Sequence, residues 1–261
     1  MRYLRLLAVQ LRTSVVTSME YRLDFLIEGG MSVFWMAWNL IPLLILFAAR
    51  DTVAGWGFEE SLLVIGWFTI LRALVEGAIN PSLVDIVERI RTGAFDYILL
   101  KPVDAQFLVS TFRFRPWKIV DFVGGVGLLV YACIASGARP GFLEIAAAGA
   151  LVIAAAGVLY SAWILIISAC FWVVRLDNLA YLFTSVFDAG RWPVQVFRGA
   201  WRVIFTLVIP LALMTTYPAM ALLGTLELRT ALYAIVGALL FMFVARRIWL
   251  FALGHYTSAS S

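Results

Sequence analysis

The sequence contains few of the residues that carry acid–base or metal chemistry. Among 261 residues it has one histidine and two cysteines, and charged residues make up only 14%. The histidine is His255, close to the C-terminus, so metal sites and proton relays built on histidine have almost no material. Cys133 and Cys170 lie within apolar runs and are better explained as small buried hydrophobic residues than as a disulfide or a metal site.

Lysine is also scarce, and this excludes one common way of using ATP. Lys101 and Lys118 are the only lysines, and neither follows the G-x-x-x-x-G spacing of a phosphate-binding loop. We therefore expect the chain to bind no cofactor or metal and to contain no catalytic residue. The formal net charge of +4 does not indicate nucleic acid as a partner and is better explained by orientation in a membrane.

Apolar residues are what the sequence has in excess. They make up 63% of the chain, and the mean hydropathy is +0.95. A soluble domain has roughly 25% charged residues, so this chain has too little polar surface to bury its apolar residues in one soluble core. The composition predicts an all-α membrane protein with several spans, in a single domain over residues 1–261.

Six apolar stretches reach or approach the roughly 20 residues that a helix needs to cross a bilayer. They are 25–49, 60–79, 117–136, 142–173, 179–192 and 230–252. Before the last span lies 193–224, an apolar segment broken by three prolines. We interpret 194–208 and 211–223 as two short re-entrant helices that enter the membrane and return on one side. The alternative is one further span, which would place the termini on opposite sides.

The first 20 residues predict an amphipathic helix in the membrane interface. Apolar residues recur at helical spacing from Leu4 to Val15, and arginines fall on the other side. There is no apolar run followed by a small-residue cleavage site, as a signal peptide would have. A transit peptide is the competing interpretation, because no acidic residue precedes Glu20. We favour the interfacial helix because 21–28 leads directly into the first span.

Most of the 20 Lys and Arg residues fall on one side of a six-span arrangement. The same side receives the two termini and the segment 80–104. The positive-inside rule places that side in the cytoplasm.

The charged segment 80–104 interrupts the apolar runs. Asn80 as N-cap, Pro81 in the first helical position and Gly93 as a stop predict a helix of about 12 residues that lies on the cytoplasmic surface. One side of this helix is an apolar stripe, and the other carries charges of both signs. A helix resting on lipid would be mainly basic, which favours a docking site for a cytoplasmic partner. The alternative is a connector with a solvated charged face.

The same segment carries a motif that we recognise. Residues 90–102, IRTGAFDYILLKP, follow the pattern I-R-x-G-x-x-D-x-x-L-L-K-P. With this motif and its order of spans, the chain resembles, over essentially its whole length, the permease subunits of the type 2 ABC export family (ABC-2). The most similar branch often pairs two related permeases with one ATPase type. The resemblance implies a bacterial plasma (inner) membrane protein with both termini in the cytoplasm.

The resemblance also implies partners and site residues. Two copies of a separate ATPase subunit would bind ATP and Mg, and a second permease, identical or related, would complete a path for an amphipathic or lipid-like substrate in the lipid bilayer. Segment 80–104 would be the coupling helix that contacts the ATPase. The matching positions are Asp85, Glu88, Arg89, Arg91, Gly93 and Asp96. Pro193 and Pro210 match the short outer helices that help to close the external gate.

Four further charged residues lie within or beside predicted spans. Arg72 and Glu76 are one turn apart in the second span, where ionised groups must face the protein interior and pair. Asp188 and Arg191 lie near the end of the fifth. These residues are either structural or part of the translocation path or permease interface.

Two other function classes compete with the exporter. An ion- or proton-coupled secondary transporter would need more titratable groups near the membrane midplane and commonly shows inverted repeats. A membrane-embedded enzyme would need clustered catalytic residues on one face of the membrane. Neither pattern is visible in the sequence.

Overall fold

The computed structural model describes residues 2–20, 22–172, 185, 187–203, 205–206 and 210–256. Within these ranges the regular elements are helices, and the one β feature is an isolated bridge between Val53 and Trp56. Five helices are long and apolar enough to cross a membrane, judged by length and composition. They are Phe25–Ala49, Phe58–Arg91, Pro116–Ala135, Phe142–Ala169 and Leu228–Gly254. The predicted all-helical, multi-span class is therefore confirmed.

The number of spans stays a prediction. The five long helices overlap the predicted spans 25–49, 60–79, 117–136, 142–173 and 230–252. Half of the predicted fifth span, 179–192, lies outside the described residues.

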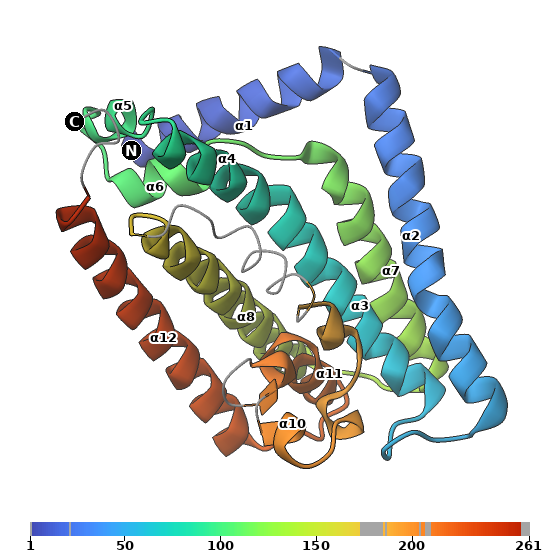
Figure 1. Ribbon diagram of the computed structural model, residues 1–261. Helices are drawn as coiled ribbons and strands as arrows, with labels where there is room; N and C mark the ends of the chain where they lie inside the picture. The colour runs from blue at the N-terminus through green and yellow to red at the C-terminus, as the bar shows by residue number, and fades with distance from the viewer. Residues whose placement is uncertain are drawn as a thin grey trace.

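Helix α1 (Arg2–Glu20) runs across one end of the bundle at a steep angle to α2 (Arg22–Ala49), as Figure 1 shows. It packs on the segment that precedes α7. The ring of Tyr3 meets the ring of Phe107 edge to face at 4.9 Å, and the backbone N–H of Phe114 donates to the Ser14 hydroxyl at 3.1 Å. The predicted amphipathic helix is thus present, and its exposed leucines and valines are free to contact lipid.

Helix α3 (Phe58–Leu74) passes through a π-helical turn (Val75–Ile79) into α4 (Asn80–Arg91). The predicted N-cap at Asn80 is therefore wrong, because Asn80 has helical backbone angles within a continuous run. The proline that follows explains the π turn. Pro81 has no N–H to donate to the carbonyl of Gly77, and the N–H of Arg115 donates to that carbonyl instead, at 2.8 Å.

Two pairs of long helices form most of the core. Helix α7 (Ile119–Ala135) packs along α3, and α12 (Leu228–Gly254) packs along α8 (Phe142–Ala169). Glycines allow the first pair to approach closely. A Cβ added to Gly125 would lie 3.0 Å from the carbonyl oxygen of Gly66. Small residues at helix contacts are typical of packing within membranes.

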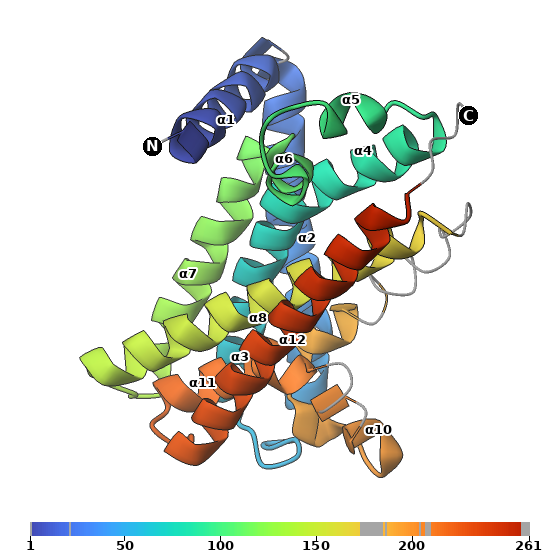
Figure 2. The same cartoon turned by 90° about the vertical axis from the view of Figure 1, so that its left-hand side faces the viewer.

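The remaining elements are short and lie at the two ends of the bundle. Helices α5 (Asp96–Leu99) and α6 (Ala105–Thr111) follow α4, and a short 3-10 turn (Pro116–Lys118) precedes α7. Figure 2 shows α1, α4, α5 and α6 at one end of the molecule, with α10 (Ala200–Val203) and α11 (Tyr217–Leu222) toward the other. The beginning of α1 and the end of α12 lie at the same end as α4.

The segment predicted to be re-entrant contains short helices, as expected, with different boundaries. A π turn (Ala212–Thr216) continues into α11, which agrees with the predicted helix 211–223. The predicted helix 194–208 is wrong in its first part. There the chain forms a 3-10 turn at Val194–Val196, after an earlier one at Ala189–Arg191. The break before α10 falls at Gly199, whose φ of 58° suits glycine.

Candidate functional site

Helix α4 has one buried apolar face, as its pattern predicts. Leu83 and Ile86 are fully buried, and Ile90 is nearly so. They belong to one apolar cluster with Phe95 and Trp249, among other residues of α6, α8 and α12. This face therefore holds α4 against the bundle and leaves the opposite face for solvent or a partner.

The predicted coupling charges separate into two pairs with different surroundings. Asp85 accepts a hydrogen bond from Arg89 at 2.5 Å, and both side chains are half-buried. The Arg89 guanidinium also lies 4.3 Å from the centre of the Phe112 ring, a favourable cation–π geometry. Glu88 and Arg91 pair at 2.9 Å and are 57% and 61% exposed. The pair formed by Glu88 and Arg91 is thus the more exposed of the two pairs.

Gly93 ends α4 as predicted, with a φ of 75° that favours glycine. The chain then turns into α5, where Asp96 is half-buried and lies close to Tyr256, just beyond α12. Burial, together with the nearby Asp96 carboxylate, raises the pKa of Tyr256 to about 12. Gly93 and Asp96 therefore shape and anchor the tip of this segment.

Three apolar side chains on the same segment are more than half exposed, and the sequence analysis missed them. Val84, Tyr97 and Leu100 are 57%, 73% and 79% exposed. Val84 precedes Glu88 by four residues and Arg91 by seven, so the three share one face of α4. We call residues 80–104 the coupling segment, after its predicted role, and we call Val84, Glu88, Arg91, Tyr97 and Leu100 its outer surface. The spacing of Tyr97 and Leu100 around buried Ile98 was a usable signal, since a short helix buries only one side.

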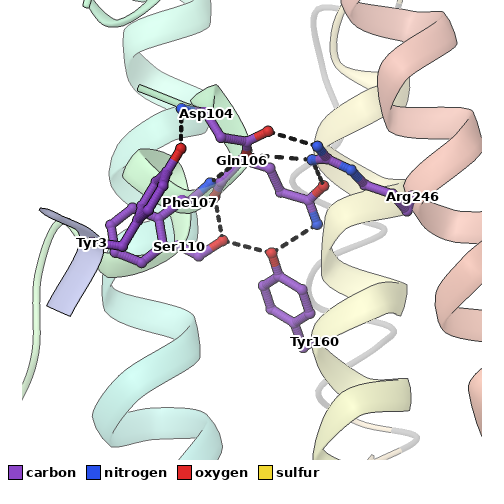
Figure 3. Close-up of polar contacts among 7 residues, drawn as sticks. All are labelled: Tyr3, Asp104, Gln106, Phe107, Ser110, Tyr160 and Arg246. Atoms are coloured by element: carbon purple, nitrogen blue, oxygen red, sulfur yellow. Dashed lines mark hydrogen bonds and ion pairs between the residues drawn. The ribbon is translucent and has the colours of Figure 1, made fainter. Parts of the chain in front are cut away.

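Polar side chains join the end of this segment to α8 and α12 (Figure 3). Arg246 donates to Asp104 at 2.6 Å and also to the side-chain oxygen of Gln106. The Gln106 amide donates to the Tyr160 hydroxyl at 2.8 Å, and the hydroxyls of Tyr160 and Ser110 lie 2.7 Å apart. We call these five residues the Asp104 cluster. It links α6 to α8 through Tyr160 and to α12 through Arg246.

Asp104 has two structural tasks in this cluster. Its carboxylate accepts from the N–H of Phe107 at 3.0 Å and so caps the start of α6. The hydrogen bond from Arg246 is the main reason that the pKa of Asp104 lies below its ordinary value, and burial partly opposes it. The cluster is therefore held by a carboxylate that stays ionised.

Arg72 and Glu76 pair as predicted and continue into a longer chain of charges. Arg72 donates to Glu76 at 2.7 Å, Lys118 contacts the other oxygen of Glu76 at 2.7 Å, and Lys118 contacts Asp121 at 2.8 Å. The sequence analysis missed Lys118 and Asp121, although their spacing of three residues at the start of a helix favours such a pair. Two cations and two acids thus neutralise one another between α3 and the start of α7.

These residues line a pocket of about 340 Å³ between α2, α3 and the start of α7. Its charged residues are Glu28, Arg72, Glu76, Arg115, Lys118 and Asp121, and its aromatic residues are Trp35, Phe68 and Trp117. Arg72 and Glu76 therefore lie on an accessible surface, which fits both the structural and the transport hypotheses for them.

Asp188 and Arg191 are joined through the backbone. The guanidinium of Arg191 donates to the backbone carbonyl of Asp188 at 3.1 Å and to the side-chain oxygen of Asn39 at 3.2 Å. Asn39 lies in α2 and lines the pocket. Arg191 thus ties the start of the proline-broken region to α2.

The two predicted gate prolines lie in different surroundings. Pro193 is buried, and the next N–H, of Val194, donates to the Thr216 hydroxyl at 3.1 Å. Pro210 is half-buried at the start of the helix that leads to α11. Both precede short helices, and α10 and α11 lie at the end of the molecule away from α4 (Figure 2). A gating role for them stays a prediction.

A comparison with known families decides the class of this protein. A family model described as ABC-2 family transporter protein matches residues 33–260. The chain belongs to the ABC-2 transporter family. The predicted resemblance is thereby confirmed, and the protein is an ABC-2 type permease with several membrane-spanning helices. Permeases of this family have no ATPase domain of their own and generally work with an ATPase subunit. No curated protein and no solved structure matches the chain.

Proposed function

We propose that this ABC-2 permease is the membrane subunit of an ATP-driven exporter and that a separate ATPase docks on the outer surface of the coupling segment. The observation that carries the proposal is the exposure of Tyr97 and Leu100, at 73% and 79%. They lie outside the five long apolar helices, on the segment that also carries the exposed charges of Glu88 and Arg91. Large apolar side chains exposed outside the membrane mark contact sites for partners.

The same segment is built to pass movement into the membrane. Helix α4 continues α3 through the π turn, and the Asp104 cluster connects α6 to α8 and α12. A partner that displaces the outer surface would therefore act on three long helices at once. Rigid elements joined by packed and hydrogen-bonded contacts are suited to such coupling.

The wider assembly follows from the same proposal. Two copies of the ATPase would supply ATP and Mg, and two permeases, identical or related, would form the path for an amphipathic or lipid-like substrate. We place α1, the end of α12 and the coupling segment in the cytoplasm of a bacterium, because they share one end of the molecule (Figure 1) and belong to the side of the predicted arrangement that holds most of the Lys and Arg residues. The proline-broken segment 193–224, with Pro193 and Pro210, would lie at the outer gate.

Co-expression and co-purification with a candidate ATPase subunit test the proposal. We would reverse the exposed pair with E88R and R91E together, make L100E separately, and measure complex formation and ATP hydrolysis in lipid nanodiscs. Both variants are expected to insert normally and to lose about tenfold or more in affinity for the ATPase, the loss typical of a central interface residue.

A matched control reverses an exposed charged pair elsewhere. Arg50 and Asp51 lie between α2 and α3, at the far end of α2 from α1, and are exposed. The double variant R50D and D51R should bind the ATPase like the wild type. If it loses as much affinity as the variants of the outer surface, or if those variants lose none, the assignment of the docking site is wrong.

A further inference from the structure

The pocket between α2 and α3 is lined by two charged side chains that are not part of the ion-paired group Arg72, Glu76, Lys118 and Asp121. Arg72, Glu76, Lys118 and Asp121 are joined by three ion pairs and sum to zero. Glu28 in α2 and Arg115 just before the 3-10 turn are both exposed and line the same pocket. Within the described part of the chain, neither side chain has an ion pair or hydrogen-bond partner. The pocket therefore offers one unpaired anion and one unpaired cation.

The residues that line the pocket are of the kind found where lipid headgroups meet lipid acyl chains. Trp35 and Trp117 line it, and tryptophan rings are enriched at that level of a membrane. Along α2, Ile27 and Met31 also line the pocket and are 62% and 43% exposed. The charged site is thus continuous with an apolar helix surface that lipid chains can cover.

We propose that this pocket binds the headgroup of a zwitterionic phospholipid that carries a primary ammonium and a phosphate. The ammonium would lie beside Glu28 and donate to its carboxylate. The phosphate would lie beside Arg115, because guanidinium and phosphate pair well in geometry and charge. The acyl chains would run along the exposed face of α2.

The charge balance selects this headgroup over an anionic one. A phosphate without an ammonium would pair with Arg115 but would add a second anion to a pocket that already holds the unpaired Glu28 carboxylate, and like charges repel. The volume of about 340 Å³ lies within the roughly 300–1,000 Å³ of small-molecule pockets. The inference does not depend on the exporter proposal, because a lipid can occupy the pocket as substrate or as a resident molecule.

Native mass spectrometry of the purified, delipidated full-length chain tests the proposal. The probes are short-chain phosphatidylethanolamine and phosphatidylglycerol, which share the phosphate and differ in the ammonium. The variants are E28Q and R115Q, with R139Q and E227Q as controls, since these residues are also exposed and do not line the pocket. Unfolding midpoints establish that each variant is folded.

The wild type should bind phosphatidylethanolamine saturably and more tightly than phosphatidylglycerol. Loss of one charged contact should weaken phosphatidylethanolamine binding about tenfold in both E28Q and R115Q. Phosphatidylglycerol binding should fall in R115Q alone, because this lipid has no ammonium for Glu28. No saturable binding, an equal effect of E28Q on both lipids, or an equal loss in the control variants would overturn the proposal.

A soluble headgroup analogue separates a lipid ligand from a water-soluble one. Glycerophosphoethanolamine has the same ammonium and phosphate without acyl chains, and it should compete much more weakly than the lipid. Equal competition would show that the α2 surface contributes nothing and that the ligand is not a lipid. Neither experiment involves the ATPase, so failure here and failure of the exporter proposal are separate results.

Discussion

Arg246 of α12 donates hydrogen bonds to both carboxylate oxygens of Asp104, which lies 142 residues earlier in the chain. The two side chains are 38% and 35% exposed, so water screens part of their attraction. The contact is nevertheless the ionic link between the segment that follows α4 and the last long helix. This contact is therefore the first place to test whether the segment after α4 and helix α12 are coupled.

A double-mutant cycle measures this link. D104N and R246M should each lower the free energy of unfolding by about 1 kcal/mol, the value for a charged hydrogen bond reduced by exposure. The double variant should lose less than the sum of the two, because the second change removes a partner that is already lost. Thermal unfolding in detergent gives the three values. Strict additivity would show that the two residues do not stabilise one another.

The contact between Asp104 and Arg246 should make the free energy of unfolding depend on pH. Because Arg246 lowers the pKa of Asp104 in the folded state, the unfolded chain takes up this proton first as the pH falls below the ordinary value of about 3.9. Stability from Asp104 is present above that pH and is lost as the pH falls through the folded pKa. The deficit of D104N relative to wild type should therefore shrink in acid. Unfolding midpoints from neutral pH to about pH 3 measure it. A deficit that does not change with pH would contradict the assignment.

Two glycines in α7 should respond differently to the same substitution. A Cβ on Gly125 would lie 2.7 Å from the side chain of Ile70 and 3.0 Å from the carbonyl of Gly66, whereas a Cβ on Gly127 meets nothing within 4 Å. G125A should lower the free energy of unfolding by about 1–3 kcal/mol, because α3 and α7 must separate. G127A should be neutral or slightly stabilising, since alanine favours helix. Equal unfolding midpoints in detergent would show that the two helices pack less closely than described.

Lys118 should be the most sensitive member of the chain of charges. Its side chain is 16% exposed and contacts both Glu76 and Asp121. K118M would leave two acids sharing the single cation Arg72, at a cost of about 2–3 kcal/mol, somewhat less than for a fully buried pair. K118R keeps the charge and should recover most of the stability. If methionine is tolerated as well as arginine, the chain of charges is not structural.

Features that depend on local chemistry were predictable from the sequence. The helix at 80–91 and its stop at Gly93 follow from hydrophobic spacing and from a backbone angle that glycine adopts easily. The pair Arg72 and Glu76 follows from helical spacing in an apolar run. Each of these needs only neighbours within about one turn.

Features that depend on distant segments were not predictable in this way. The sequence predicts a helix start at Asn80 because Pro81 has no N–H to donate. The helix nevertheless continues through Asn80, because the N–H of Arg115 donates to the Gly77 carbonyl in place of the absent N–H of Pro81. Arg89 and Arg91 each pair with an acid of α4, and contact with the Phe112 ring distinguishes the half-buried Arg89 from the exposed Arg91. No local pattern contains these contacts, because they arise when 112–118 folds back on α3 and α4.

The π turn at Val75–Ile79 has a geometric consequence for the coupling segment. A π turn accommodates about one residue more than an α turn, and each residue of an α-helix advances the side-chain direction by roughly 100°. If the same residues formed an uninterrupted α-helix instead, Glu88 and Arg91 would therefore point roughly 100° away from their present direction relative to α3. By absorbing one extra residue, the π turn thus determines which side of α4 faces solvent.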